Sequence, residues 1–256
     1  MNLVIDCGNT NIKLALFVQN KMIDYKSITS FSIDMISDFL AEHSSHTINS
    51  VCVSNNSKYD FGVLKNNLSL DVVWINISHE SRLPIKIHYH TPETLGPDRI
   101  ALATAASIKY SGDKLIVDFG TCITYDFVTG NDFLGGQINL GFNTRFKALS
   151  YYTNNLPYIT ASKIDDVGQS LSDSIMGVTT RESMLIGVRD SLISELTHVI
   201  DKYKSRYPSI KIIFTGGDMM FFKDMLQLNF ESNQNFIDPY LLMEGLNYII
   251  AFNEEK

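Results

Sequence analysis

A short unit occurs twice in this chain, once at the start and once near the middle. VIDCGNT at residues 4–10 and IVDFGTC at residues 116–122 each combine an apolar run, an acidic residue and a glycine-containing turn, followed by a second apolar run. An internal repeat of this kind indicates two structural units of the same plan. We therefore expect an α/β chain of two similar domains, residues 1–112 and 113–256, each with a mixed sheet flanked by helices.

Apolar runs and their spacing predict the elements around the two turns. Strands are expected at residues 3–6, 12–18, 21–28, 50–54, 71–75, 85–89 and 210–214, with three more within residues 114–141. Helical spacing predicts helices at residues 32–42, 59–66, 97–110, 142–154, 180–207, 218–228 and 239–253. The mixture of both kinds of element fits the α/β class.

The composition is that of a globular protein, with 45% hydrophobic and 19% charged residues among 256. No apolar run approaches the roughly 18 residues that a membrane-spanning helix needs, so we expect no membrane contact. The first residues, MNLVIDCGNT, lack the basic region of a signal peptide, which favours a cytoplasmic protein. A net charge of −7 argues against nucleic acid as a partner, because phosphate contacts need a basic face.

The three cysteines, Cys7, Cys52 and Cys122, are widely spaced and form no CxxC pair. This pattern indicates neither a disulfide framework nor a structural zinc site. We expect all three to be small, reduced core residues.

Three histidines, His79, His88 and His90, lie close together in the sequence, but their spacing is not that of a zinc motif. Alternation along a strand would place His88 and His90 on one face, which leaves a metal site as the less favoured alternative. Trp74 is expected in the core rather than as a platform for a ligand.

The first turn carries groups that suit a phosphate ligand. In DCGNTNIK, residues 6–13, Gly8 allows close approach of the backbone, and Asn9, Thr10 and Lys13 add side-chain donors. Asp6 could hold a magnesium ion, directly or through water, because that ion prefers oxygen ligands. The alternative is an ordinary hairpin turn, in which Asn and Gly are common.

The second turn repeats this chemistry. Asp118 offers a carboxylate to a cation and Thr121 a hydroxyl to a phosphate, and Gly135 and Gly136 could bring further backbone close. Two matching turns could approach one nucleotide from both sides. Two purely structural hairpins are the alternative.

A third glycine-rich step, TGGD at residues 215–218, follows an apolar strand and precedes an expected helix. Such a step could let an adenosine lie against the backbone, and a helix N-terminus favours anionic groups. A plain connection in which Asp218 caps the helix is compatible with this hypothesis.

Together, these features resemble the actin-like (ribonuclease H-like) architecture of actin-like ATPases and sugar kinases. Five segments in order resemble the type III pantothenate kinase family more specifically. They are DCGNTNIK (6–13), LGPDRIALATAA (95–106), IVDFGTCITYD (116–126), FLGGQINLG (133–141) and TRESMLIG (180–187). The resemblance covers nearly the whole chain.

The resemblance implies roles for matching positions. The ATP-binding residues would be Asp6, Cys7, Gly8, Asn9, Thr10, Asn11, Ile12, Lys13 and Thr121. The pantothenate-binding residues would be Tyr89, Gly96, Pro97, Asp98, Arg99 and Thr180. It further implies that Asp98 accepts the substrate proton, that Asp118 binds potassium or ammonium, that Mg²⁺ accompanies ATP, and that Thr180 reaches the partner's site in a homodimer.

Asp98 and Arg99 also make chemical sense as a pair. A primary alcohol is a poor nucleophile, and a nearby carboxylate can accept its proton. A guanidinium binds a carboxylate-bearing substrate through two parallel hydrogen bonds. Without the resemblance, we would favour an acid facing the helix dipole next to a surface arginine.

The chain departs from the family pattern at several positions. Cys122 replaces an alanine, Leu140 a proline and Thr91 an asparagine, and Ser183 and Met184 replace Ala-Ile in the segment after Thr180. None of these changes removes a group that is assigned to catalysis, although Leu140 could loosen its turn.

The favoured hypothesis is ATP-dependent phosphorylation of pantothenate to 4'-phosphopantothenate, the first step of coenzyme A biosynthesis. One alternative is a kinase for another small hydroxyl compound. Another is a non-catalytic accessory protein of the same fold that regulates transcription, against which the net charge of −7 argues.

Overall fold

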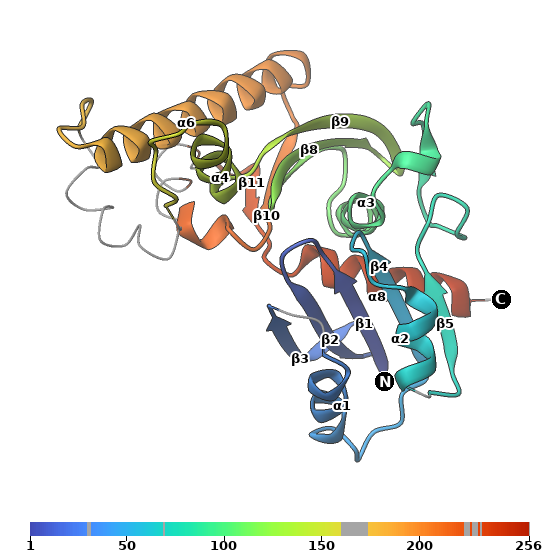
Figure 1. The fold of residues 1–256 in the computed structure, drawn as a ribbon. Helices are drawn as coiled ribbons and strands as arrows, with labels where there is room; N and C mark the ends of the chain where they lie inside the picture. Colours follow the sequence, from blue (N-terminus) through green and yellow to red (C-terminus); the bar gives the residue numbers. More distant parts are fainter. Residues whose placement is uncertain are drawn as a thin grey trace. The chain divides into compact units, whose positions relative to one another are not determined.

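The computed structural model describes residues 1–29, 32–68, 70–159, 174–222, 226, 230 and 232–255. Its strands form two sheets, and helices flank them (Figure 1). Within the described ranges, no helix is long and apolar enough to cross a membrane.

The first sheet has five strands in the order β3-β2-β1-β4-β5. Its strands are β1 (Asn2–Cys7), β2 (Ile12–Val18), β3 (Lys21–Ile28), β4 (Ser50–Asn55) and β5 (Val73–Asn76). The sheet is mixed, because β1 pairs antiparallel with β2 and parallel with β4. The parallel pairing brings the carboxyl ends of β1 and β4 to one edge, with Cys7 opposite Asn55.

The second sheet has six strands in the order β11-β10-β7-β8-β9-β6. Its strands are β6 (Lys86–Ile87), β7 (Asp113–Phe119), β8 (Cys122–Thr129), β9 (Asp132–Leu140), β10 (Lys211–Thr215) and β11 (Asn235–Ile237). The repeated sequence unit therefore forms the same feature in both sheets, which is a pair of neighbouring strands joined by a glycine turn.

The helices are of two kinds. The α-helices are α1 (Ile33–Ala41), α2 (Phe61–Leu68), α3 (Pro97–Lys109), α4 (Phe142–Tyr152), α6 (Thr180–Arg206) and α8 (Leu241–Glu254). The short 3-10 helices are η1 (Pro92–Thr94) and η3 (Met219–Phe222).

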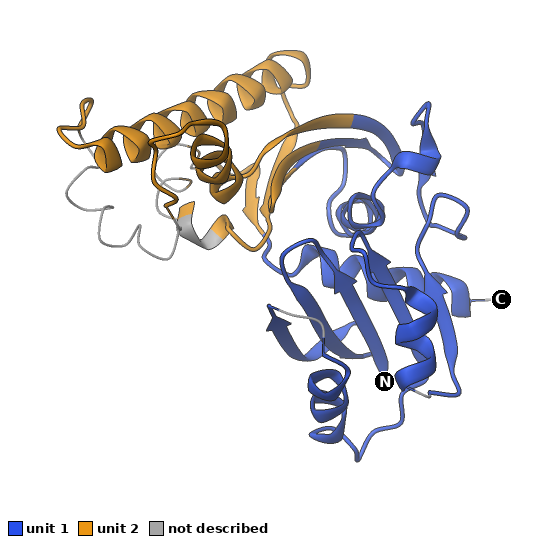
Figure 2. Ribbon diagram, viewed as in Figure 1, with its two compact units in different colours: residues 1–116, 126–135, 238–256 blue, residues 117–125, 136–237 orange. Residues whose placement is uncertain are grey.

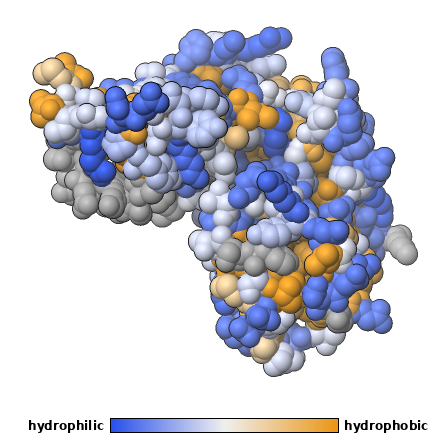
Figure 3. Space-filling model, viewed as in Figure 1, coloured by the Kyte–Doolittle hydropathy of each residue, from blue (hydrophilic) through white to orange (hydrophobic). Residues whose placement is uncertain are grey.

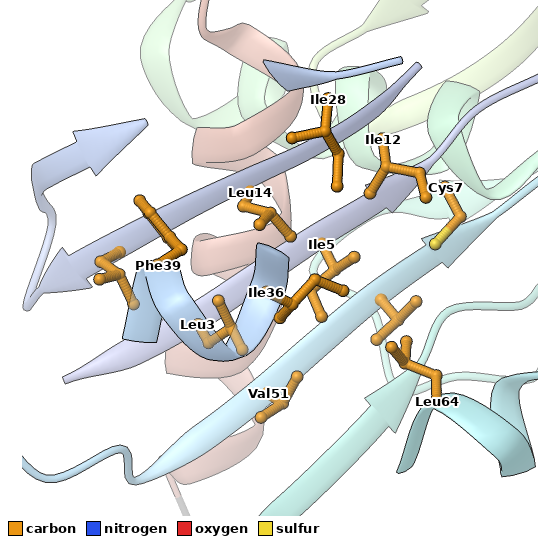
Figure 4. Close-up of a cluster of buried hydrophobic side chains, with 12 residues drawn as sticks. Leu3, Ile5, Cys7, Ile12, Leu14, Ile28, Ile36, Phe39, Val51 and Leu64 are labelled. Atoms are coloured by element: carbon orange, nitrogen blue, oxygen red, sulfur yellow. The ribbon is translucent and has the colours of Figure 1, made fainter. Parts of the chain in front are cut away.

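The two faces of β1 have different partners. Leu3, Ile5 and Cys7 belong to a buried cluster that also takes in Ile36 of α1 and Leu64 of α2 (Figure 4). Successive side chains of a strand point to opposite faces, so the other set of side chains on β1 lies on the face that α8 covers.

The covered face holds polar groups as well as apolar ones. Asn2 on β1 donates from Nδ2 to Oδ1 of Asn247 on α8 at 3.0 Å. Asp6 lies on the same side of β1 as Asn2, because the two are an even number of residues apart. Helix α3 packs against α8 in turn. The alternation therefore turns the first acidic residue away from the α1–α2 core and toward the α8 side.

The chain divides into two compact units, shown in different colours in Figure 2. One consists of residues 1–116, 126–135 and 238–256, and the other of residues 117–125 and 136–237. We call them unit 1 and unit 2. The division into residues 1–112 and 113–256 that the repeat favours remains a prediction.

Most expected elements are present, and the structure corrects the remaining expectations. The strand expected at residues 85–89 is only Lys86–Ile87, and η1 and β11 were not anticipated. The helix expected at residues 218–228 begins as η3, and part of it lies outside the described residues. Cys122 is exposed, unlike the buried Cys7 and Cys52, because it begins β8 directly after the glycine turn.

Candidate functional site

The turn between β1 and β2 forms one wall of a pocket in unit 1. Gly8 donates its backbone N–H to the carbonyl oxygen of Asn11 at 3.1 Å, which closes the turn. The pocket has a volume of about 330 Å³ and is lined by Gly8, Asn9, Thr10, Asn11, Ile12, Thr29, Ser57, Lys58 and Tyr59. Lys58 is the one charged side chain among these lining residues. The pocket is therefore suited to an anionic group.

The segment from residue 57 to residue 59 is a part of this pocket that the sequence analysis missed. The side chain of Asn55 organises it, since its Oδ1 accepts from the backbone N–H and the hydroxyl of Ser57 at 3.0 and 2.7 Å. Its Nδ2 donates to the carbonyl oxygen of Tyr59 at 2.7 Å. The parallel strands β1 and β4 could have indicated this wall, because ligands bind beyond the carboxyl ends of such strands.

Asp6 at the end of β1 is almost fully buried, at 4% exposure. Its Oδ1 accepts from the Ser54 hydroxyl at 3.0 Å, and its Oδ2 lies 3.6 Å from Nζ of Lys13. Burial raises the pKa of Asp6, Lys13 lowers it, and the charge of Asp98 raises it further. The carboxyl groups of Asp6 and Asp98 therefore lie within electrostatic reach of each other, and a bound cation would favour the ionised form of Asp6.

Asp98 lies in the first turn of α3, just after Pro97, and its carboxylate folds back toward Gly96. Its Oδ1 accepts the backbone N–H of Arg99 at 2.8 Å. A Cβ atom on Gly96 would lie only 2.4 Å from that same oxygen. Gly96 therefore leaves the space that the carboxylate occupies.

Arg99 is buried rather than on the surface, at 5% exposure, so the alternative of a surface arginine is wrong. Its Nε donates to Oδ1 and Oδ2 of Asp126 at 2.9 and 3.2 Å, and its Nη2 donates to Oδ1 at 2.5 Å. Burial lowers the pKa of Arg99, but hydrogen bonds and charge from Asp126 and Tyr89 outweigh this, and the net direction is upward. The two-pronged contact expected for a substrate carboxylate is thus made to Asp126, and direct contact of Arg99 with substrate remains a prediction.

Tyr89 lies next to Arg99 in unit 1. The guanidinium carbon of Arg99 lies 5.6 Å from the ring centroids of both Tyr89 and Phe133. Gly135 lies against the Tyr89 ring, because a Cβ atom there would be 3.8 Å from it. Unit 1 therefore brings Asp6 and Asp98 together, and likewise Tyr89 and Arg99.

The second repeated turn lies in unit 2, between β7 and β8. Gly120 donates its backbone N–H to the carbonyl oxygen of Cys122 at 3.0 Å. The carbonyl oxygen of Thr121 accepts from the backbone N–H of Gly141 at 3.1 Å and from the Thr144 hydroxyl at 2.5 Å. These bonds fix the backbone of the turn and leave the side chain of Thr121 exposed.

The third glycine step packs directly against this turn. Gly216 has a φ of +104°, and a Cβ atom there would lie 2.4 Å from Oδ1 of Asp118 and from backbone atoms of Phe119. Asp218 donates its backbone N–H to the carbonyl oxygen of Phe119 at 3.0 Å. The GG step and the acidic turn therefore form one local structure.

Thr180 is the first residue of α6 and is exposed. Thr179 caps this helix, with its hydroxyl accepting from Glu182 N–H at 3.2 Å, while the Glu182 carboxylate accepts from Thr179 N–H at 3.2 Å. This reciprocal capping box fixes where the helix begins. Asp118, Thr121 and Thr180 thus all belong to unit 2.

The remaining candidates contribute little to these sites. His88 interacts through Nε2 with Oδ1 of the half-buried Asp132 at 2.8 Å. No cluster of three or more His, Cys, Asp or Glu side chains that could hold a metal ion occurs among the residues the structure describes. Trp74 packs partly buried against the α1–α2 core, as expected. Burial raises the pKa of the Cys7 thiol to about 12, so this cysteine stays protonated at neutral pH.

Solved structures of known proteins share the fold. A protein from Campylobacter jejuni described as a Baf family transcriptional activator aligns with a TM-score of 0.60 at 21% identity, covering 99% of this chain and 100% of its own. A protein from Listeria monocytogenes described as an N-acetylmannosamine kinase aligns with a TM-score of 0.52 at 14% identity, covering 99% of both chains. At these identities the likeness bears on the fold, which is the actin-like fold of the sugar kinases.

Sequence comparisons are more specific. The type III pantothenate kinase from Christiangramia forsetii is 37% identical over 259 aligned residues, and that from Bacteroides fragilis 34% identical over 261, with full coverage of all chains. The family model of type III pantothenate kinases matches residues 2–202. This chain therefore belongs to the type III pantothenate kinase family.

Proposed function

We propose that this protein transfers the terminal phosphoryl group of ATP to the primary hydroxyl of pantothenate. The product is 4'-phosphopantothenate, and the reaction is the first step of coenzyme A biosynthesis. The observation that carries the proposal is in unit 1, where Asn56 lies between the end of β1 and the start of α3. Its backbone N–H donates to the carbonyl oxygen of Cys7 at 3.0 Å, and its Oδ1 would lie 3.5 Å from a Cβ atom on Gly96, beside the carboxylate of Asp98. An acceptor base and a phosphate site thus share one locality.

Each residue of unit 1 has a distinct part in this proposal. The turn from Asp6 to Lys13 binds the ATP phosphates, and the positive charge of Lys58 on the pocket wall favours them. Asp98 accepts the proton of the hydroxyl as the phosphoryl group moves. Mg²⁺ bound near Asp6 would neutralise phosphate charge. Most of the rate gain would still come from positioning.

The remaining candidate residues of the proposal belong to unit 2. Asp118 is our candidate for the potassium or ammonium ion, since its carboxylate lies against the fixed backbone of Gly216 and Phe119. Thr121, with its side chain exposed on the adjoining turn, is the candidate contact to ATP. A cation bound there would assist nucleotide binding by offsetting phosphate charge.

A homodimer is part of the proposal, with Thr180 contacting pantothenate in the partner's site. The segment before Thr180 exposes apolar side chains, with Ile175 at 92%, Met176 at 70% and Val178 at 83% exposure. Figure 3 shows hydrophobic side chains on the surface near the start of α6. An exposed apolar segment of this kind is typical of a protein interface. We place the enzyme in the cytoplasm, where ATP is available, with no role for nucleic acid or membrane.

The first test is the release of ADP from purified protein with magnesium-ATP, with and without pantothenate. We expect release that depends on pantothenate and is several-fold stronger in potassium than in sodium buffer. A panel of other small alcohols tests the alternative of a different acceptor. Folded protein that releases no ADP in either buffer, and binds DNA in a salt-dependent way, would instead support the regulatory alternative.

Replacing Gly96 by alanine should reduce turnover while leaving the fold intact. The new Cβ atom would collide with Oδ1 of Asp98, and the end of a side chain can move where backbone cannot. We expect kcat to fall about 10–100-fold, because a base displaced by about 1 Å loses its alignment. The unfolding midpoint should barely change. The double variant with Gly96→Ala and Asp98→Asn should have the same kcat as Asp98→Asn alone, since both substitutions act on the Asp98 carboxylate.

A further inference from the structure

We infer that Asp126 is a positioning residue for the pantothenate site and that it acts through Arg99. Asp126 lies in the middle of β8 and its side chain is fully buried, at 0% exposure. It is therefore too deep to touch a substrate directly. The kinetic consequence of this inference depends on the proposed function, whereas its structural part does not.

The first step is the geometry of the pair. The planar fork of Arg99 uses Nε and Nη2 on the Asp126 carboxylate, with distances of 2.5–3.2 Å. Such a contact fixes the plane of the guanidinium as well as its position. The Arg99 side chain is 6% exposed, so both charges are shielded from water and depend on each other.

The second step connects this pair to the candidate base. Arg99 is adjacent to Asp98 in the first turn of α3, and its backbone N–H donates to Oδ1 of Asp98 at 2.8 Å. One residue thus holds Asp126 with its side chain and Asp98 with its backbone. A shift of the Arg99 side chain would therefore displace the first turn of α3, which carries Asp98.

The third step connects the pair to Tyr89. The guanidinium carbon lies 5.6 Å from the ring centroids of both Tyr89 and Phe133. A cation over an aromatic ring is attracted to its face, which orients the ring. Asp126 therefore fixes Arg99 directly. Through Arg99 it also fixes the Tyr89 ring and the turn that carries Asp98.

The central experiment compares Asp126→Asn with wild type. Asparagine keeps the shape but loses the charge, so Arg99 is left with weaker and fewer contacts. We expect kcat/KM for pantothenate to fall about 10–100-fold, as expected for a misplacement of about 1 Å. The affinity for ADP, measured by calorimetry without pantothenate, should stay within about twofold, because the nucleotide turn is not anchored by Arg99. Asp113→Asn is the matched control, as Asp113 accepts a bond from Thr129 on the neighbouring strand and has no contact with Arg99 among those described.

A second variant covers the case in which Asp126→Asn does not fold. Removing both charges, with Arg99→Gln and Asp126→Asn together, leaves no buried unpaired ion and should restore folding. It should not restore turnover of pantothenate. Wild-type kcat/KM for pantothenate in either folded variant would overturn the inference. A loss of ADP affinity as large as the loss of kcat/KM would also overturn it, because a merely structural role predicts that both fall together.

A spectroscopic measurement separates this inference from the proposed function. The Nε–H of Arg99 should give a slowly exchanging signal in a proton–nitrogen correlation spectrum, identified by its absence in Arg99→Gln. We expect the signal to shift and exchange faster in Asp126→Asn and to be unchanged in Asp113→Asn. If wild type fails to phosphorylate pantothenate but shows this pattern, only the proposed function fails. If the signal exchanges rapidly in wild type, the positioning inference fails whatever the activity.

Discussion

Replacing Asp98 by asparagine is expected to lower kcat for pantothenate by about 10²–10⁴-fold. The amide oxygen of asparagine can still accept the backbone N–H of Arg99, so the local structure should be kept. What is lost is the ability to take the proton of the primary hydroxyl. Nucleotide affinity should not fall, because the charge lost from Asp98 is negative and the turn at residues 6–13 is a separate segment.

The measurement is steady-state ADP release at saturating ATP, together with ADP affinity by calorimetry. Glu93→Gln is a suitable control, since Glu93 is an exposed acid in η1, close to Asp98 in the sequence, and loses the same charge. Unchanged turnover in a preparation free of wild-type enzyme would show that the base is another group.

Replacing Gly216 by alanine is expected to lower the free energy of unfolding by about 2–5 kcal/mol. Two costs combine: a positive φ of +104° strains any residue with a Cβ atom, and that atom would lie 2.4 Å from Asp118 and Phe119. The backbone atoms of Phe119 cannot easily move, because Asp218 N–H donates to its carbonyl oxygen. Any protein that still folds should have a displaced Asp118, so the stimulation by potassium that we propose should also be lost.

The neighbouring residue supplies a matched control. A Cβ atom on Gly217 would meet nothing within 4 Å, so Gly217→Ala should alter stability by less than about 0.5 kcal/mol. Urea unfolding followed by two different probes would measure both variants and would reveal whether the two units unfold together. Equal behaviour of the two variants would contradict the close packing of Gly216 on the acidic turn.

Local features of this fold were predictable from the sequence. The apolar runs of β2 and β3 and the helix that begins at Pro97 appear at the expected residues, because each depends on neighbours in the chain. The repeated acidic turns were also recognisable, since an acid, a glycine and two flanking strands are a short-range pattern. The prediction that Cys122 lies in the core was wrong, because the exposure of a residue next to a turn depends on what packs against that turn.

Features that depend on distant residues were not predictable. The sequence gives Arg99 no obvious partner, because Asp126 meets it only when β8 lies beside the start of α3. The wall of the unit 1 pocket at residues 57–59 likewise depends on the parallel pairing of β1 with β4. Single-sequence periodicity identifies strands but does not state which strands become neighbours.

The composition of unit 1 has a consequence for how the protein matures on the ribosome. Residues 238–256 belong to the unit that the N-terminus begins, and α8 packs on β1 and β4. During synthesis, the face of β1 that packs on α8 therefore stays incompletely covered until α8 has left the exit tunnel. The chain cannot finish its N-terminal unit first, as multidomain proteins commonly do. Truncation after residue 237 should accordingly destabilise unit 1 more than unit 2, because the removed residues belong to unit 1.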